Sequence, residues 1–208
     1  FISPKLYDKP ALAPDDPLRD GIRLLNPLGD DTSVMRTTAV GSLLGALAYN
    51  RSHRIPSCAL FENATIYAKP DASTPSDLFS NEEKQLVCGF YGSGDFYDLK
   101  GYIAALADTL HIDALRFEAE ASVPYFHPGR CAAVYAGKAL LGRFGQLHPA
   151  VCDNFELPGD VYAAVLSTKA LFAAAQTEWE YRPLPVYPAV ERDLALVMDV
   201  ATEAGVVE

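Results

Sequence analysis

Apolar residues at helical spacing mark the clearest element of the 208-residue chain. After Asp95, a residue type that often caps a helix N-terminus, Leu99, Ile103, Leu106 and Leu110 recur every three or four positions. One face of such a helix is apolar and the other is polar. The pattern therefore predicts an amphipathic helix that begins just after Asp95.

A second helix is predicted through residues 35–50, capped by Thr32 or Ser33. Apolar residues mark one face of it, and Gly41, Gly45 and Ala48 form a second face of small residues. Each glycine costs a helix about 1 kcal/mol relative to alanine, so a compensating gain is expected. We expect either the close approach of another backbone or a helix that is weakened at these positions.

Alternating or uniformly apolar runs predict strands elsewhere. These runs cover residues 1–3, 22–25, 57–68, 84–92, 115–122, 131–136, 139–147, 161–166 and 192–199. The runs on either side of Gly137-Lys138 predict a hairpin, because glycine accepts the positive φ of a two-residue turn. Short helices are predicted from Pro149 and after Ser167 or Thr168, and a helix or turn is predicted to start at Ser80 or Asn81. This mixed order favours an α+β fold on an antiparallel sheet.

Composition and charge narrow the class of protein. Half of the residues are hydrophobic and 21% are charged, which is typical of a globular domain. No apolar run approaches the roughly 20 residues of a membrane helix, so a soluble protein is expected. The formal net charge of −10 repels a phosphate backbone and disfavours nucleic-acid binding by this chain alone. The first residue is Phe1 and no closing element follows the last strand, so we expect a piece of a longer protein.

Residues that could carry chemistry are sparse in the sequence. The four cysteines are far apart, without metal-ligand spacing, and are expected to be buried reduced thiols; no metal site is predicted. His127 and His148 each precede a proline, which favours extended backbone at an element boundary, so structural roles are expected for both. No nucleophile elbow and no glycine-rich phosphate loop is present.

Arg116 and Glu118 form one tempting pair. They lie two residues apart on a predicted strand, so their side chains share a face, as in the motif with which class II aminoacyl-tRNA synthetases hold ATP. The same spacing also gives an ordinary ion pair on a strand. The glycine-rich strand ending in an arginine that should accompany the motif is missing.

Five ordered motifs together resemble the later part of the bacterial phenylalanyl-tRNA synthetase β subunit. They are NPLGDDTSVMRTT, LAYN, SGDFYDLKGY, HPGRCAAVYAGKALLGRFGQLHP and YPAVERDLALVMD, and they span almost the whole chain. The sequence departs from the family at Phe61-Glu62-Asn63-Ala64, where an FEIG-like strand end is expected, and at Val40, where many members have proline.

The resemblance implies a class II catalytic-like fold, an antiparallel sheet flanked by helices, that lacks catalytic residues. Residues 1–184 would form this domain, and residues 185–208 would begin the ferredoxin-like anticodon-binding domain. The domain would pack against the catalytic α subunit of an α2β2 phenylalanine–tRNA ligase in the cytoplasm. This chain would hold no cofactor, because ATP and Mg²⁺ belong to the complete enzyme. The complete enzyme would also bind tRNA(Phe).

The resemblance also singles out residues for structural or interface roles. These are Asn26, Pro27, Arg36, Gly41, Gly45, Asp98, Lys100, His127, Arg130 and His148. Two alternatives remain open at this point. One is a relic nucleotide or amino-acid site that uses Arg116 and Glu118, and the other is an acidic binding module unrelated to translation.

Overall fold

A computed structural model describes residues 1–71, 79–177, 186–200 and 202. The chain divides into two units, Phe1–Thr177 and Glu178–Glu208. The predicted domain boundary after residue 184 lies outside the described residues. The first unit holds every α-helix and named strand of the described part, so the fold below is the fold of that unit.

Six antiparallel strands form one sheet in the order β1-β2-β6-β5-β4-β3. Their bounds are β1 (Cys58–Ala68), β2 (Asn81–Tyr91), β3 (Leu115–Ala119), β4 (Phe126–Ala136), β5 (Ala139–Leu147) and β6 (Val161–Ser167). Four helices flank it, α1 (Val40–Ser52), α2 (Phe96–Thr109), α3 (Pro149–Phe155) and α4 (Thr168–Ala174). The predicted α+β class, with helices on an antiparallel sheet, is confirmed.

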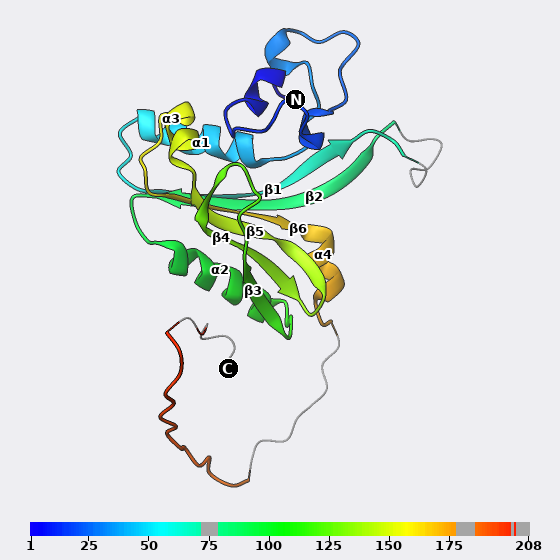
Figure 1. Cartoon of the computed structure of the whole chain (residues 1–208). Helices are drawn as coiled ribbons and strands as arrows, with labels where there is room; N and C mark the ends of the chain where they lie inside the picture. Colours follow the sequence, from blue (N-terminus) through cyan, green and yellow to red (C-terminus); the bar gives the residue numbers. More distant parts are fainter. Residues whose placement is uncertain (72–78, 178–185, 201, 203–208) are drawn as a thin grey trace. The chain divides into compact units, whose positions relative to one another are not determined.

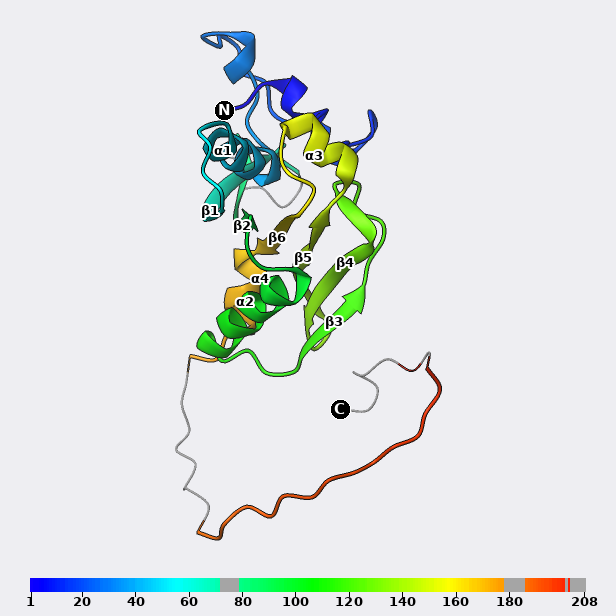
Figure 2. The ribbon, with the colours of Figure 1, turned by 90° about the vertical axis from the view of Figure 1, so that its left-hand side faces the viewer.

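Helices cover both faces of the sheet. Figure 1 shows α1 and α3 on one side of the sheet and α2 on the other. The core under α1 and α3 contains Leu44, Leu47, Val87 and Val151 among other buried residues. Figure 2 shows α2 and α4 next to each other on the opposite face, over a second core that includes Phe144. The sheet is therefore the middle of three layers.

Local sequence explains most of the elements. The Asp95 carboxylate accepts hydrogen bonds from Tyr97 N–H at 2.7 Å and Asp98 N–H at 3.1 Å, which starts α2 where predicted. The β4–β5 hairpin turns at Gly137 with φ +57°, and Ala136 pairs with Ala139. The predicted two-residue turn is confirmed. Pro149 opens α3, and Ser167 caps α4 by accepting from Ala170 N–H at 3.2 Å.

The first helix begins at Val40, so the predicted start near residue 35 is wrong. Asp30–Thr32 instead form a short 3-10 helix, η3, and Ser33 donates to the Asp30 carbonyl at 3.0 Å. Val34 then forms isolated bridges with both Ile2 and Arg23. Backbone pairing with distant segments thus keeps residues 34–36 extended, against their local helical pattern.

Four smaller predictions are also wrong. Residues 1–3 and 22–25 contribute one isolated bridge each, at Ile2 and Arg23, rather than strands. Asn81 begins β2 and not a helix. Residues 192–199 form no strand, because none of them pairs with a strand of the described chain, and a lone strand has no partner for its N–H and C=O groups.

Candidate functional site

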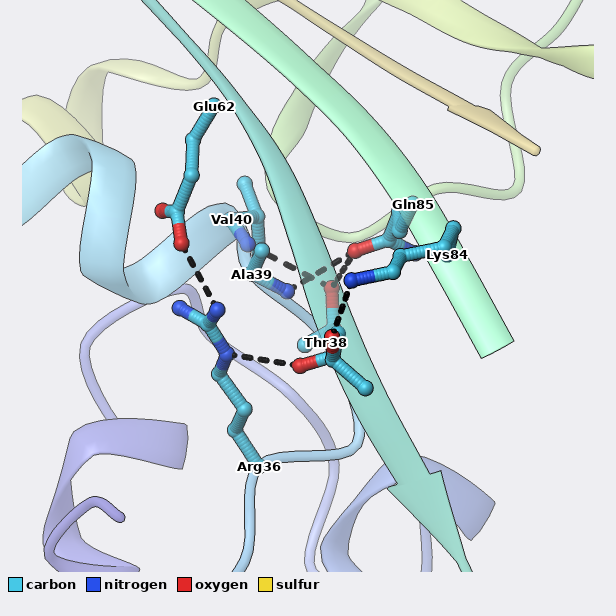
Figure 3. A network of polar contacts seen from close by, with 8 residues as sticks. Arg36, Thr38, Ala39, Val40, Glu62, Lys84 and Gln85 are labelled. Carbon is cyan, nitrogen blue, oxygen red and sulfur yellow. Dashed lines mark hydrogen bonds and ion pairs between the residues drawn. The ribbon is translucent and has the colours of Figure 1, made fainter. Parts of the chain in front are cut away.

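Arg36 ties the segment before α1 to the edge of the sheet. Its Nε donates to the Thr65 carbonyl at 3.0 Å and its Nη2 to Glu62 Oε1 at 2.7 Å (Figure 3). Its own carbonyl accepts from Tyr67 N–H at 2.8 Å. Only 19% of the Arg36 side chain is exposed, against 42% for Glu62. The arginine therefore works as a brace between this segment and β1.

Gln85 of β2 accepts hydrogen bonds from the residues at the N-terminus of α1. The N-cap residue, Ala39, has no side chain that can accept a hydrogen bond, and the Val40 N–H donates instead to the Thr38 hydroxyl at 3.4 Å. Gln85 Oε1 accepts from Ala39 N–H at 2.8 Å and from the Thr38 hydroxyl at 3.2 Å (Figure 3). Sequence reasoning missed Gln85. Gln85 ends the polar run at the start of β2, directly before the apolar run from Leu86, so no local signal separates it from its polar neighbours.

A shallow cavity of about 190 Å³ lies beside Gln85. It is lined mainly by strand residues, including Ile66, Glu83, Gln85, Arg143, Val165 and Ser167. Drug-sized ligands occupy pockets of about 300–1,000 Å³, so this cavity is small for a nucleotide. None of the residues singled out for a structural, interface or nucleotide-site role lines it. The proposed relic site and the cavity therefore do not coincide.

Arg116 and Glu118 lie on β3, the strand at one end of the sheet. Their side chains form an ion pair with each other, and both are about half exposed. The Arg116 guanidinium also lies over the Tyr135 ring, 4.9 Å from its centroid. Arg116 and Glu118 are thus paired with each other on an edge strand, as in the ordinary ion pair that their spacing allows.

Asp98 and Lys100 stabilise the first turns of α2. Asp98 Oδ2 accepts from Asp95 N–H at 2.7 Å, the reciprocal half of a capping box. Lys100 Nζ lies 4.7 Å from the centroid of the Phe117 ring, so it links α2 to β3 by a cation–π contact. Both contacts are structural.

The two His-Pro pairs lie at neighbouring strand ends, because Phe126 of β4 pairs with Leu147 of β5. His127 Nδ1 accepts from Gly129 N–H at 3.1 Å. His148 caps α3, with Nδ1 accepting from Ala150 N–H at 3.2 Å. The Nδ1 atom of each ring therefore satisfies a backbone donor.

Arg130 connects the same hairpin to the chain that enters β6. Its Nη1 donates to Gln146 Oε1 at 2.6 Å, and Gln146 Nε2 donates to the Gly159 carbonyl at 3.2 Å. Gln146 is buried, so these hydrogen bonds satisfy an amide that would otherwise be costly to bury.

Four residues predicted to have structural or interface roles remain, Asn26, Pro27, Gly41 and Gly45, and only Gly41 is buried. Asn26 and Pro27 are exposed. A Cβ at Gly41 would lie 3.1 Å from the Leu6 side chain, whereas nothing lies within 4 Å of one at Gly45. The expected close approach of another backbone is therefore absent at both glycines within the described chain. Gly41 leaves room for the Leu6 side chain, and Gly45 faces open space.

Glu120 and Arg143 form a pair that sequence reasoning missed. Arg143 Nε donates to Glu120 Oε2 at 3.1 Å, and Ser122 donates to Glu120 Oε1 through its N–H at 2.9 Å and its hydroxyl at 2.8 Å. The Ser122 hydrogen bonds, followed by the Arg143 guanidinium, lower the pKa of Glu120 to about 2. The partners are 23 residues apart, and no local pattern joins them.

The cysteines are free thiols. Burial raises the pKa of Cys88 and Cys152 to about 11 and that of Cys131 to about 12, so these three are poor nucleophiles at neutral pH. In the described ranges, no group of three or more His, Cys, Asp or Glu side chains could hold a metal ion. Nor do those ranges contain a helix long and apolar enough to cross a membrane.

The fold resembles that of a known enzyme class. A crystal structure of pyrrolysyl-tRNA synthetase from Desulfitobacterium hafniense matches with a TM-score of 0.62 and 17% sequence identity. The match covers 82% of this chain and 58% of that one. The expected class II synthetase-like fold is thus confirmed at the level of the fold.

Sequence comparisons give the family. The chain is 38% identical over 199 residues to the phenylalanine–tRNA ligase β subunit of Clostridium tetani, which covers 96% of this chain. It is 40% identical to that of Anaeromyxobacter dehalogenans over 91% of this chain. The chain spans about a quarter of the length of these curated relatives. Residues 1–168 match the family model described as the phenylalanyl tRNA synthetase beta chain CLM domain. The chain therefore belongs to the phenylalanyl-tRNA synthetase β-chain family and carries its CLM domain.

Proposed function

We propose that this chain serves phenylalanine–tRNA ligase as a non-catalytic scaffold, which packs against the catalytic α subunit in an α2β2 enzyme. Membership of the β-chain family supports the assignment to this ligase. One observation supports the scaffold role above the others. Each residue with a charged or imidazole side chain that was singled out for a structural or interface role makes a structural contact: Arg36, Asp98, Lys100, His127, Arg130 and His148.

In this proposal, the turn around Asn26 and Pro27 is part of the surface that contacts the α subunit. Leu25 and Leu28 flank these two residues, and both leucine side chains are fully exposed. Two fully exposed leucine side chains within one turn are available for an apolar contact with a partner. Gly45 adds an open, small-residue position on α1 that a partner could approach closely.

The complete enzyme, and not this chain, handles the reactants in this proposal. ATP and Mg²⁺ are needed for aminoacylation and are held by the α subunit, while tRNA(Phe) is bound by the complete enzyme. The net charge of −10 agrees with a chain that does not bind tRNA alone. Residues 1–184 form the catalytic-like domain, and residues 185–208 begin the anticodon-binding domain. The cytoplasm is the proposed location.

Association with the α subunit tests the interface. Size-exclusion chromatography with light scattering should give a 1:1 complex when the folded chain is mixed with α. Leu28→Asp should weaken this complex at least tenfold, because it places a charge in an apolar contact. Phe172→Asp, at an exposed aromatic residue of α4, is the matched control. A folded chain that does not bind α would contradict the interface role.

Aminoacylation by the complete enzyme tests the non-catalytic role. Arg116→Ala and Glu118→Ala in the β subunit should leave kcat/KM within about twofold of wild type, because this pair lies on an outer strand away from the cavity. A tenfold loss in an enzyme that still assembles would favour the relic nucleotide site instead. ATP titration of the isolated chain, with no binding expected, gives an independent readout.

A further inference from the structure

One edge of the sheet is open over part of β1. At its C-terminal end, β1 directs backbone groups of Thr65 and Tyr67 away from β2. Tyr67 N–H donates to the Arg36 carbonyl, and the Thr65 carbonyl accepts from Arg36 Nε. Outward groups alternate along a strand, so Ala59, Phe61 and Asn63 also direct their N–H and C=O groups outward. In the part of the chain that the structure describes, no hydrogen bond joins these groups to another segment.

This open edge has little protection against pairing. Ala59, Phe61 and Asn63 are exposed and uncharged, and 78% of the Phe61 side chain is accessible. Natural sheets usually guard such an edge with lysine, proline, a bulge or a covering segment. Here the Arg36 segment covers only the end at Thr65 and Tyr67. The three residues therefore form a short, ready template for another strand.

We propose that the open edge of β1 pairs with β1 of a second copy of this chain, antiparallel, about a two-fold axis at Phe61. This register places Phe61 opposite Phe61 of the other copy and Ala59 opposite Asn63. All three outward residues then form hydrogen-bonded pairs, and the interface uses one patch on both copies, as a two-fold interface must. The Arg36 segments stop the ladder at both ends, so the register is fixed.

The side chains fit this arrangement. Asn63 Oδ1 accepts from the Thr168 hydroxyl of α4 at 3.1 Å, so the odd-numbered side chains of β1 lie on the α4 side of the sheet. The two Phe61 rings would meet on that side, beyond α4, as a cross-strand aromatic pair. The net charge of −10 on each copy opposes association, but the three outward residues are uncharged, and Glu62, which lies between Phe61 and Asn63, is paired with Arg36. Association should therefore strengthen as salt screens the repulsion.

Cysteine cross-linking tests the register. Residues opposite each other in a hydrogen-bonded pair have Cα atoms about 5.5 Å apart, within the range that a disulfide spans. Under mild oxidation, Phe61→Cys should give a disulfide-linked dimer. Ala59→Cys should not, because its two copies lie four residues apart along the ladder. Wild type controls for the native thiols. Absence of the Phe61→Cys dimer, or equal cross-linking of Ala59→Cys, would overturn the proposal.

Light scattering tests the association without covalent chemistry. Wild type should shift from the 22.5 kDa monomer toward twice that mass as its concentration rises, and further at 0.5 M than at 0.05 M NaCl. Phe61→Lys should remain monomeric across the same range, because it places two like charges opposite each other. Phe172→Lys should behave as wild type. A wild type that stays monomeric at millimolar concentration would refute the pairing. No α subunit is needed, so this outcome is independent of the proposed function.

Discussion

At the scale of single residues, polar side chains join segments that are distant in the sequence. Arg36 illustrates this, since it contacts Glu62 and the Thr65 carbonyl of β1. We predict that Arg36→Gln lowers the free energy of unfolding by about 1–2 kcal/mol, mostly through the lost hydrogen bond to a partly buried carbonyl. Urea unfolding measures this. Arg54→Gln, at an exposed turn residue, should change it by less than about 0.5 kcal/mol. Equal effects would show that Arg36 is not a brace.

Glu120 makes stability depend on pH. Its folded-state pKa, about 2, lies below the usual value of 4.5, so its contribution is fully present above about pH 4.5 and is lost as the pH falls toward 2. We predict that Glu120→Gln lowers the free energy of unfolding at pH 6 by about 1 kcal/mol, given solvent screening of a surface carboxylate. The difference from wild type should shrink between pH 4.5 and pH 2.5. If the difference in the free energy of unfolding between Glu120→Gln and wild type stays constant with pH, the loss of stability comes from packing and not from the charge of Glu120.

At the scale of elements, the two glycines of α1 should respond in opposite ways to the same substitution. Gly45→Ala should stabilise the protein by about 0.5–1 kcal/mol, because the methyl group enters open space and alanine lowers the entropy of the unfolded chain. Gly41→Ala should give no such gain, because its Cβ would press on Leu6 at 3.1 Å. Thermal unfolding of both variants checks this. A gain at Gly41 as large as that at Gly45 would contradict the packing described.

Elements with local signals could be predicted from the sequence, and elements that depend on distant partners could not. The α2 cap at Asp95 and the turn at Gly137 are encoded within a few residues, and both predictions are confirmed. The segment at residues 34–36 has a helical pattern but pairs with Ile2, Arg23 and β1 instead. The strand prediction at 192–199 was wrong because its pattern came without a pairing partner.

The candidate site divides in the same way. The residues at element ends were found because caps and turns use characteristic residue types, as His148 before Pro149 does. Gln85 and the pair of Glu120 with Arg143 were missed, because each contacts a segment that is distant in the sequence, and no local pattern marks such a contact. The tertiary arrangement of strands and loops decides these contacts.

At the scale of the whole molecule, the first unit should fold without the second. Phe1–Thr177 contains the whole sheet and both apolar cores. We predict that a chain ending at Thr177 keeps the unfolding midpoint of the full chain within about 2 °C. In the described part of the second unit, large apolar residues such as Leu194 and Val197 are exposed and add no core. Calorimetry of the two chains compares them, and a drop of 10 °C or more would mean that the second unit supports the first.

The place of β6 in the sheet has a consequence for synthesis in the cell. Among the six strands of this sheet β6 is the last to leave the ribosome, yet it lies between β2 and β5 and joins the two halves of the sheet. Until Val161–Ser167 emerges, the β1–β2 pair and the β3–β4–β5 group each expose the inner edge that β6 fills in the folded sheet. Nascent chains halted before residue 161 should therefore hold two unsealed half-sheets, and these are the forms of the protein most in need of a chaperone.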